Sequence, residues 1–131
     1  MDNSEDQFQE LMANAIARSN AMLRDRDMVV PFALMLSADG SIGIAVAAVD
    51  EPESALAVLT EGLRQKAEEG NMVACCICFP QESSTLTVML ENNENYCADI
   101  LLPVVGGVPR QIDLVGISAD DGTIRVFDFV E

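Results

Sequence analysis

The sequence predicts an α+β fold, in which two helices pack on one antiparallel sheet of about five to seven strands. Three observations support this. Two stretches repeat apolar residues at helical spacing, an Asp-Gly pair separates two apolar runs, and short apolar runs alternate with turn residues after residue 70. The expected order is α-β-β-α-β-β-β-β-β, with the helices on one face of the sheet. The 131 residues fit one domain, with residues 1–4 frayed.

The first helix is expected to begin at Ser4 and to end near Arg26. Apolar residues recur every three or four positions along this stretch and form one stripe. Ser4 and Gln7 have the spacing of a capping box, in which two side chains satisfy backbone N–H groups at the start of a helix. The stripe predicts that one side of this helix packs against the sheet.

The next two strands are expected at residues 31–37 and 42–49. Asp39-Gly40 between them favours a type I′ turn, because both central residues of that turn take positive φ. Along the second strand, small side chains share one face at residues 43, 45 and 47. That face predicts the close approach of another helix or strand.

A second helix is expected to open at residues 50–53 and to stop before Gly70. Pro52 suits the first helical turn, and Asp50 with Glu53 fits a cap. Gly70 is expected just beyond the helix, where a positive φ favours glycine. Gly62 lies inside the helix, where glycine costs about 1 kcal/mol relative to alanine, so we expect close packing against it.

Five further strands are expected in the second half of the chain. The first, at residues 72–79, is an uncharged apolar run that ends at Pro80, which is typical of a strand buried on both faces. The others are expected at residues 85–90, 96–102, 112–118 and 123–130. The last two are expected to pair as a hairpin across residues 119–122.

Polar and glycine residues mark the reversals between these strands. Residues 91–95 are expected to form a polar turn, and Gly106-Gly107 indicates another reversal near a sheet edge. Up to about Leu102, the order of helix, hairpin, helix and three strands resembles that of roadblock/longin and profilin-like domains. The resemblance lies in element order and implies a fold without implying a function.

Charge limits the classes of partner. The formal net charge is −15, from 22 acidic and 7 basic residues. This excess of negative charge repels nucleic-acid phosphates and anionic membrane surfaces, and the scattered basic residues form no binding patch. It fits solubility or a basic protein partner. Four cysteines and an acidic N-terminal stretch lead us to expect a reducing, cytoplasmic location and no membrane association.

The residue types argue against several chemistries. The chain has no His, which excludes His-dependent nucleophiles and general bases. It has no Trp and one Tyr, which leaves little for stacking a base or a sugar. On a strand, Cys76 and Cys78 point to one face and Cys75 to the other, so buried thiols fit better than a tetrahedral metal site. We expect no metal, no cofactor and no catalytic residue. Cys97 and one of these cysteines could form a cross-strand disulfide on exposure to air, which would be an artefact for a protein of a reducing cytosol.

Three aspartates, Asp99, Asp113 and Asp128, interrupt apolar strands. A carboxylate in such a setting either acts as a general acid or base with a raised pKa or lies on the solvent side of a half-buried strand. The residues chosen as candidates to line a pocket are Cys76, Cys78, Cys97 and Asp99.

Several strands are apolar on both faces, and two helices cover only about four strands of one face. Either the sheet curls on itself or a second copy covers the remainder, and we favour a homodimer. The expected function is a small acidic protein-interaction module of adaptor, chaperone-like or antidote type. The alternative is a small-molecule-binding or enzymatic domain with a site on the open sheet face near Cys76, Cys78 and Asp99.

Overall fold

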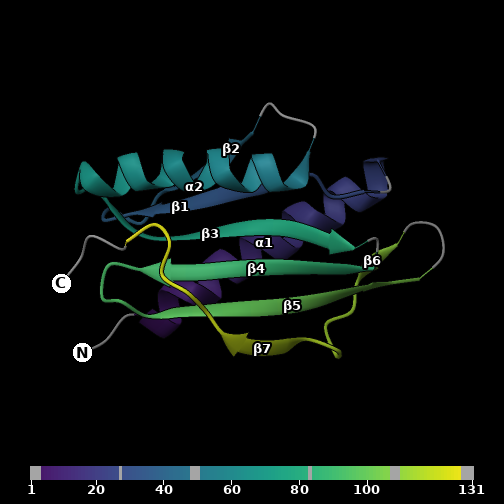
Figure 1. Ribbon diagram of the computed structural model, residues 1–131. Helices are drawn as coiled ribbons and strands as arrows, with labels where there is room; N and C mark the ends of the chain where they lie inside the picture. Colours follow the sequence, from purple (N-terminus) through teal and green to yellow (C-terminus); the bar gives the residue numbers. More distant parts are fainter. Residues whose placement is uncertain (1–3, 27, 48–50, 83, 107–109, 128–131) are drawn as a thin grey trace.

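The computed structural model describes residues 4–26, 28–47, 51–82, 84–106 and 110–127, and confirms the predicted α+β class and element order (Figure 1). The described elements are α1 (Ser4–Arg26), β1 (Phe32–Ser37), β2 (Ile42–Val46), α2 (Pro52–Glu68), β3 (Met72–Glu82), β4 (Thr85–Asn92), β5 (Cys97–Val105), β6 (Gln111–Ile112) and β7 (Ser118–Asp121). None of the described helices is long and apolar enough to cross a membrane.

The strands form one antiparallel sheet in the order β2-β1-β3-β4-β5-β6, with β7 also paired to β5. The uncharged run at 72–79 lies inside β3, between β1 and β4, as its composition predicts. The strand continues through Pro80, beyond the last β1 pair at Phe32–Cys78. Because β3 is open on its β1 side there, the missing proline N–H is tolerated. Within the described residues β2 pairs only with β1, so the sheet does not close into a barrel.

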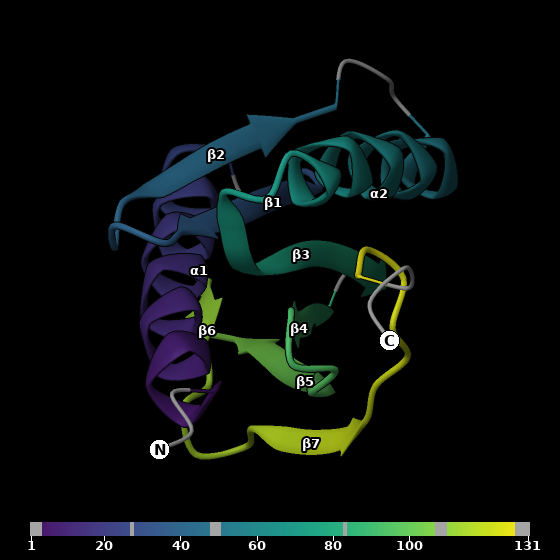
Figure 2. The ribbon, with the colours of Figure 1, turned by 90° about the vertical axis from the view of Figure 1, so that its left-hand side faces the viewer.

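The two helices lie on opposite faces of the sheet, and the expectation that both cover one face is wrong (Figure 2). We call these faces the α1 face and the α2 face. Leu34 and Cys76 belong to the apolar cluster under α1, whereas their neighbours Ala33 and Cys75 belong to the cluster under α2. Because β1 and β3 are apolar on both sides, each side needs its own cover.

The expected C-terminal hairpin is also wrong. Most of residues 119–122, expected as its turn, instead lie in β7 (Ser118–Asp121), which pairs with β5 from Ala98 to Leu101. A Cβ on Gly122 would lie 2.7 Å from the backbone nitrogen of Ala98, so glycine is required where the chain leaves this pairing. Residues 124–127 then cross the α2 face, where Val126 and Phe127 are buried. The open backbone of β5 and the uncovered apolar surface on this face outweigh the local preference for a hairpin.

The first helix and its hairpin follow the sequence closely. Ser4, expected to fray with residues 1–3, is the first residue of α1. Residues 1–3 and the capping contact expected of the Ser4 side chain lie outside what the structure describes. Gly40 has φ +91, but Asp39 does not take positive φ, so the predicted type I′ turn is wrong. Asp39 Oδ1 instead accepts hydrogen bonds from the backbone N–H of Ser41 at 2.9 Å and from its hydroxyl at 2.7 Å. These bonds lower the pKa of Asp39.

The second helix begins with Pro52 in its first turn and ends at the C-cap residue Glu69. Gly70 follows with φ +88, as predicted for the residue beyond a helix. The Asp50 cap lies outside the described residues. Gly62 is exposed, and a Cβ there would meet nothing within 4 Å, so the expected close packing is wrong. The small face of β2 does pack, since Ala45 and Ala47 contact the cluster under α2.

Candidate functional site

The structure does not bring the four candidate pocket residues together. Cys76 and Cys78 are fully buried on the α1 face, where the Cys78 sulfur lies 3.5 Å from the Ser19 hydroxyl. Cys97 and Asp99 alternate with the α1-face residues of β5, which places them on the α2 face, and Cys97 also borders the pocket between α1 and β5. The open-face site near Cys76, Cys78 and Asp99 is therefore not assembled.

The cysteines are free thiols in separate environments. Burial raises the pKa of Cys75 and Cys76 and raises that of Cys78 to about 11, which keeps these thiols neutral. Strand β4 separates Cys97 from all three, a gap of about 9–10 Å, which exceeds the reach of a disulfide. The expected cross-strand disulfide is therefore wrong. Among the described residues, no group of three His, Cys, Asp or Glu side chains is placed to hold a metal ion.

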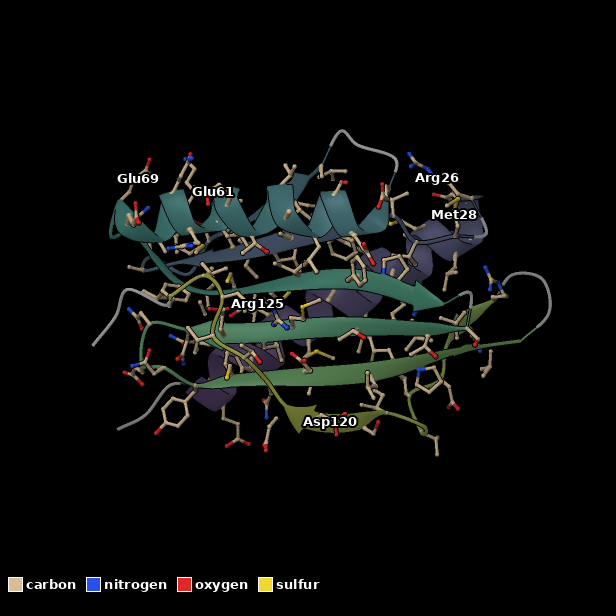
Figure 3. All side chains as sticks on the ribbon, viewed as in Figure 1. Arg26, Met28, Glu61, Glu69, Asp120 and Arg125 are labelled. Carbon is tan, nitrogen blue, oxygen red and sulfur yellow. The ribbon has the colours of Figure 1, made fainter. Side chains whose placement is uncertain are left out.

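Asp99 has a residue of like charge and a residue of opposite charge as neighbours. It is directly opposite Asp120 of β7, and its Oδ1 lies 4.0 Å from Arg125 Nη1 on the α2 face. Figure 3 labels Asp120 and Arg125. The pKa of Asp99 is raised, mainly by partial burial and also by Asp120, and the nearby Arg125 offsets part of this rise. Asp113 instead forms a local turn, since its Oδ1 accepts the N–H of Val115 at 3.0 Å. Asp128 lies outside the described residues.

Glu91 is the polar residue that sequence reasoning missed. It was expected in a polar turn, but it is the last-but-one residue of β4 and only 3% exposed. Its Oε1 accepts the N–H groups of Val126 at 2.7 Å and Phe127 at 2.9 Å, and both oxygens accept that of Arg125 at 3.1 and 3.2 Å. The carboxylate thus holds the segment that covers the α2 face.

The arrangement around Glu91 is a nest, in which successive backbone N–H groups surround an anion. The signal for it in the sequence is weak. Thr87, Met89 and Glu91 alternate along β4 and therefore share the α2 face. From the sequence, this alternation indicates only that the strand continues two residues beyond its expected end at residue 90. Nothing local to Glu91 indicates that the backbone of residues 125–127 would supply its partners.

Asn92 organises the turn that follows. It is fully buried, and its Oδ1 accepts the N–H groups of Glu94 at 3.0 Å and Tyr96 at 3.1 Å. Its Nδ2 donates to Gln7 Oε1 at 3.1 Å, which ties the turn to α1. Asn95 takes φ +66 in the same turn. These bonds position Tyr96, which is 51% exposed, beside the first half of α1.

An apolar groove of about 680 Å³ lies between α1 and β5, and we call it the α1–β5 groove. It forms because α1 packs over β1, β3, β4 and β6 and leaves the α1 face of β5 partly uncovered. The side chains that give it its apolar character are Phe8, Met12, Ile16, Tyr96, Ala98 and Ile100.

The two ends of the sheet differ in chemistry. At one end, β2 consists of five uncharged residues, and Ile44 and Val46 are 40% and 57% exposed. Both pair with α1-face residues of β1, so they point to the α1 face. At the other end, β7 has the sequence Ser-Ala-Asp-Asp and is exposed throughout. Among the described strands, β2 pairs only with β1 and β7 only with β5, so each has an unpaired edge.

Comparison with protein-family models, curated proteins and solved structures finds no match for this chain.

Proposed function

We propose that this protein is a small acidic association module that forms a homodimer by pairing its β2 edge with that of a second copy. The observation that supports this is the contrast between the two sheet edges. Natural proteins protect exposed edges with charge, and the two aspartates of β7 do so. β2 lacks charge and proline, and it exposes Ile44 and Val46. An edge of this kind favours pairing with another strand.

The pairing is antiparallel and two-fold symmetric. An isologous contact uses the same strand from each copy, and such dimers are the commonest soluble assemblies. Ile44 is the central residue of β2, so a two-fold axis near it places Ile44 opposite Ile44, and Val46 opposite Ile42, of the other copy, with these side chains on the α1 face. The two sheets then form one continuous sheet, and the unpaired N–H and C=O groups of β2 gain partners.

The acidic composition and the buried neutral thiols fit a protein that works in the reducing cytoplasm, as an adaptor or a chaperone-like or antidote protein. A small-molecule site near Cys76, Cys78 and Asp99 is not proposed, because these residues lie on opposite faces of the sheet.

The test is Val46→Glu, compared with the matched change Val115→Glu at a residue that is 95% exposed in the loop between β6 and β7. Light scattering coupled to size-exclusion chromatography measures the molar mass. At about 100 μM protein, a dimer with a micromolar Kd is populated. We expect dimers for the wild type and Val115→Glu and a monomer for Val46→Glu, because each new carboxylate would be buried against the apolar Ile42 of the other copy without a partner. A monomeric wild type, or a dimeric Val46→Glu variant, would contradict the proposal.

A further inference from the structure

We propose that the α1–β5 groove binds a basic amphipathic helix of a partner protein. This inference rests on the proposed role in protein association and names the partner class, but it uses a surface separate from the β2 edge. Four features of the groove support it: an apolar floor, acidic rims, a length that fits a short helix, and an adjacent strand edge that is already paired.

The floor supplies apolar contact. Phe8, Met12 and Ile16 contact the α1-face core but stay partly exposed, and so does Ile100 on β5. A row of partly exposed apolar side chains at helical spacing is what the apolar face of a second helix buries. Met12 adds an adaptable side chain, of the kind that recurs in peptide-binding grooves.

The rims supply charge. Glu5 of α1 lines one side of the groove. On the other side, Asp121 of β7 lies directly opposite Ala98 of the floor and therefore shares its face of the sheet. None of the described lining residues is Lys or Arg, and the chain carries a net charge of −15. A helix with a basic polar face complements both rims, whereas an acidic peptide or an anionic lipid is repelled.

Length and edge pairing select a helix over a strand. The part of α1 that lines the groove, from Glu5 to Ile16, is about 17 Å long at 1.5 Å per residue. This length equals about three turns of a partner helix. An extended peptide would need a free edge of β5, but β7 already pairs with β5 from Ala98 to Leu101. Insertion of a helix into the groove is therefore the mode that leaves the sheet intact.

Tyr96 provides a direct readout. It lines the groove, and it is the one tyrosine of a chain that contains no tryptophan. The probe is a synthetic peptide of about 12 residues, with leucines at positions i, i+3, i+4 and i+7, lysines elsewhere, and no aromatic residue. Titration of the full chain with this peptide, followed by tyrosine fluorescence, gives an affinity for this one site.

Two further peptides serve as controls, and the test variant Ala13→Arg is matched with the control variant Ala17→Arg. One peptide replaces every lysine with glutamate, and the other shuffles the leucines off one face. Ala13 lines the groove and Ala17 does not, although both are exposed residues of α1. We expect Ala13→Arg to raise the Kd at least about tenfold, because the guanidinium repels the lysines and fills the space of their apolar anchors. Ala17→Arg should change the Kd less than about twofold.

The result that supports the proposal is saturable binding of the basic peptide that Ala13→Arg weakens and Ala17→Arg does not. Equal binding of the acidic or shuffled peptide overturns it, as does an unchanged Kd for Ala13→Arg. A change in Tyr96 fluorescence on raising the protein concentration alone would also overturn it, because a second copy would then occupy the groove. A stronger response to a neutral detergent such as octyl glucoside than to the peptide would assign the groove to small apolar ligands instead.

The outcome is separable from that of the homodimer. The Val46→Glu variant alters only the β2 edge, so it should bind the basic peptide with the wild-type Kd whether or not the wild type is a dimer. If the wild type proves monomeric but the peptide binds, the groove proposal stands and the β2 pairing fails. If the peptide does not bind any variant, the groove proposal fails without bearing on the dimer.

Discussion

The two faces of the sheet are covered in different ways. On the α1 face, one helix of 23 residues supplies a continuous apolar stripe over strands that are apolar themselves. On the α2 face, a 17-residue helix covers part of the surface, and the irregular segment 124–127 covers a further part. The first cover needs only apolar contact, whereas the second also needs the carboxylate of Glu91.

The reason lies in the backbone. A helix satisfies its own N–H and C=O groups, so it can be laid on an apolar surface without further partners. A buried irregular segment carries N–H groups that would be unpaired, each at a cost of about 1–3 kcal/mol. Glu91 accepts three of them, at residues 125–127. A polar anchor is thus what allows a non-helical segment to close an apolar face.

The cysteines report on the two faces separately. Cys75 is buried in the cluster of the α2 face, whereas Cys76 and Cys78 are buried in that of the α1 face. Alkylation under native conditions, followed by peptide mass spectrometry, therefore shows which face opens in a variant. This makes the comparison between the two covers testable.

The largest effect is expected for Leu11→Ala, which removes a fully buried side chain of α1. A cavity of this kind should lower the free energy of unfolding by about 3 kcal/mol, as measured by urea denaturation. Cys76 and Cys78 should be alkylated faster than Cys75. Leu114→Ala is the matched control, because Leu114 is 63% exposed and should lose less than about 0.5 kcal/mol.

Glu91→Gln should have the next largest effect. Glutamine keeps one acceptor oxygen but loses the charge-assisted bonds, so the free energy of unfolding should fall by about 2 kcal/mol. Here Cys75 should become reactive first while Cys76 stays protected, the reverse of the order for Leu11→Ala. Glu61→Gln removes the same charge from the exposed side of α2 and should leave both readouts unchanged (Figure 3). Simultaneous exposure of all three thiols would mean that the faces do not open independently.

The smallest effect is expected from Gly62→Ala in α2. The added methyl group meets nothing within 4 Å, so the free energy of unfolding should rise by about 0.5–1 kcal/mol through helix propensity. Protection of Cys75 should rise with it, since α2 covers that face. Gly70→Ala makes the same change where φ is +88 and should destabilise the chain instead. A loss of thermal stability in Gly62→Ala would show that this glycine has a packing role.

The sequence predicted those parts of the fold whose signals are local. The apolar stripe of α1, the position of the chain reversal at Gly40 (though not its turn type) and the stop at Gly70 each depend on residues within a few positions of one another. The prediction of a C-terminal hairpin was wrong because the Asp-Gly turn signal at 119–122 competes with pairing to the open edge of β5, and the pairing prevails. That competition is decided by residues about 20 positions away along the chain.

The candidate sites were less accessible to sequence reasoning. Alternation along β3 correctly separated Cys75 from Cys76 and Cys78, but it could not show that β4 lies between these residues and Cys97. Glu91 was missed because its partners are backbone groups, which have no signature in the residue types. The groove beside Tyr96 follows from the direction in which α1 crosses the sheet, which no local pattern encodes.

The sequence by itself determined the element order, the acidic charge and the two-sided apolar character of the central strands, because propensity, charge and periodicity are properties of neighbouring residues. Only the tertiary structure decided which face each helix covers, where the C-terminal segment lies and which sheet edge stays uncharged and unpaired. Those outcomes depend on which distant surfaces bury each other and on which distant groups satisfy buried backbone N–H groups.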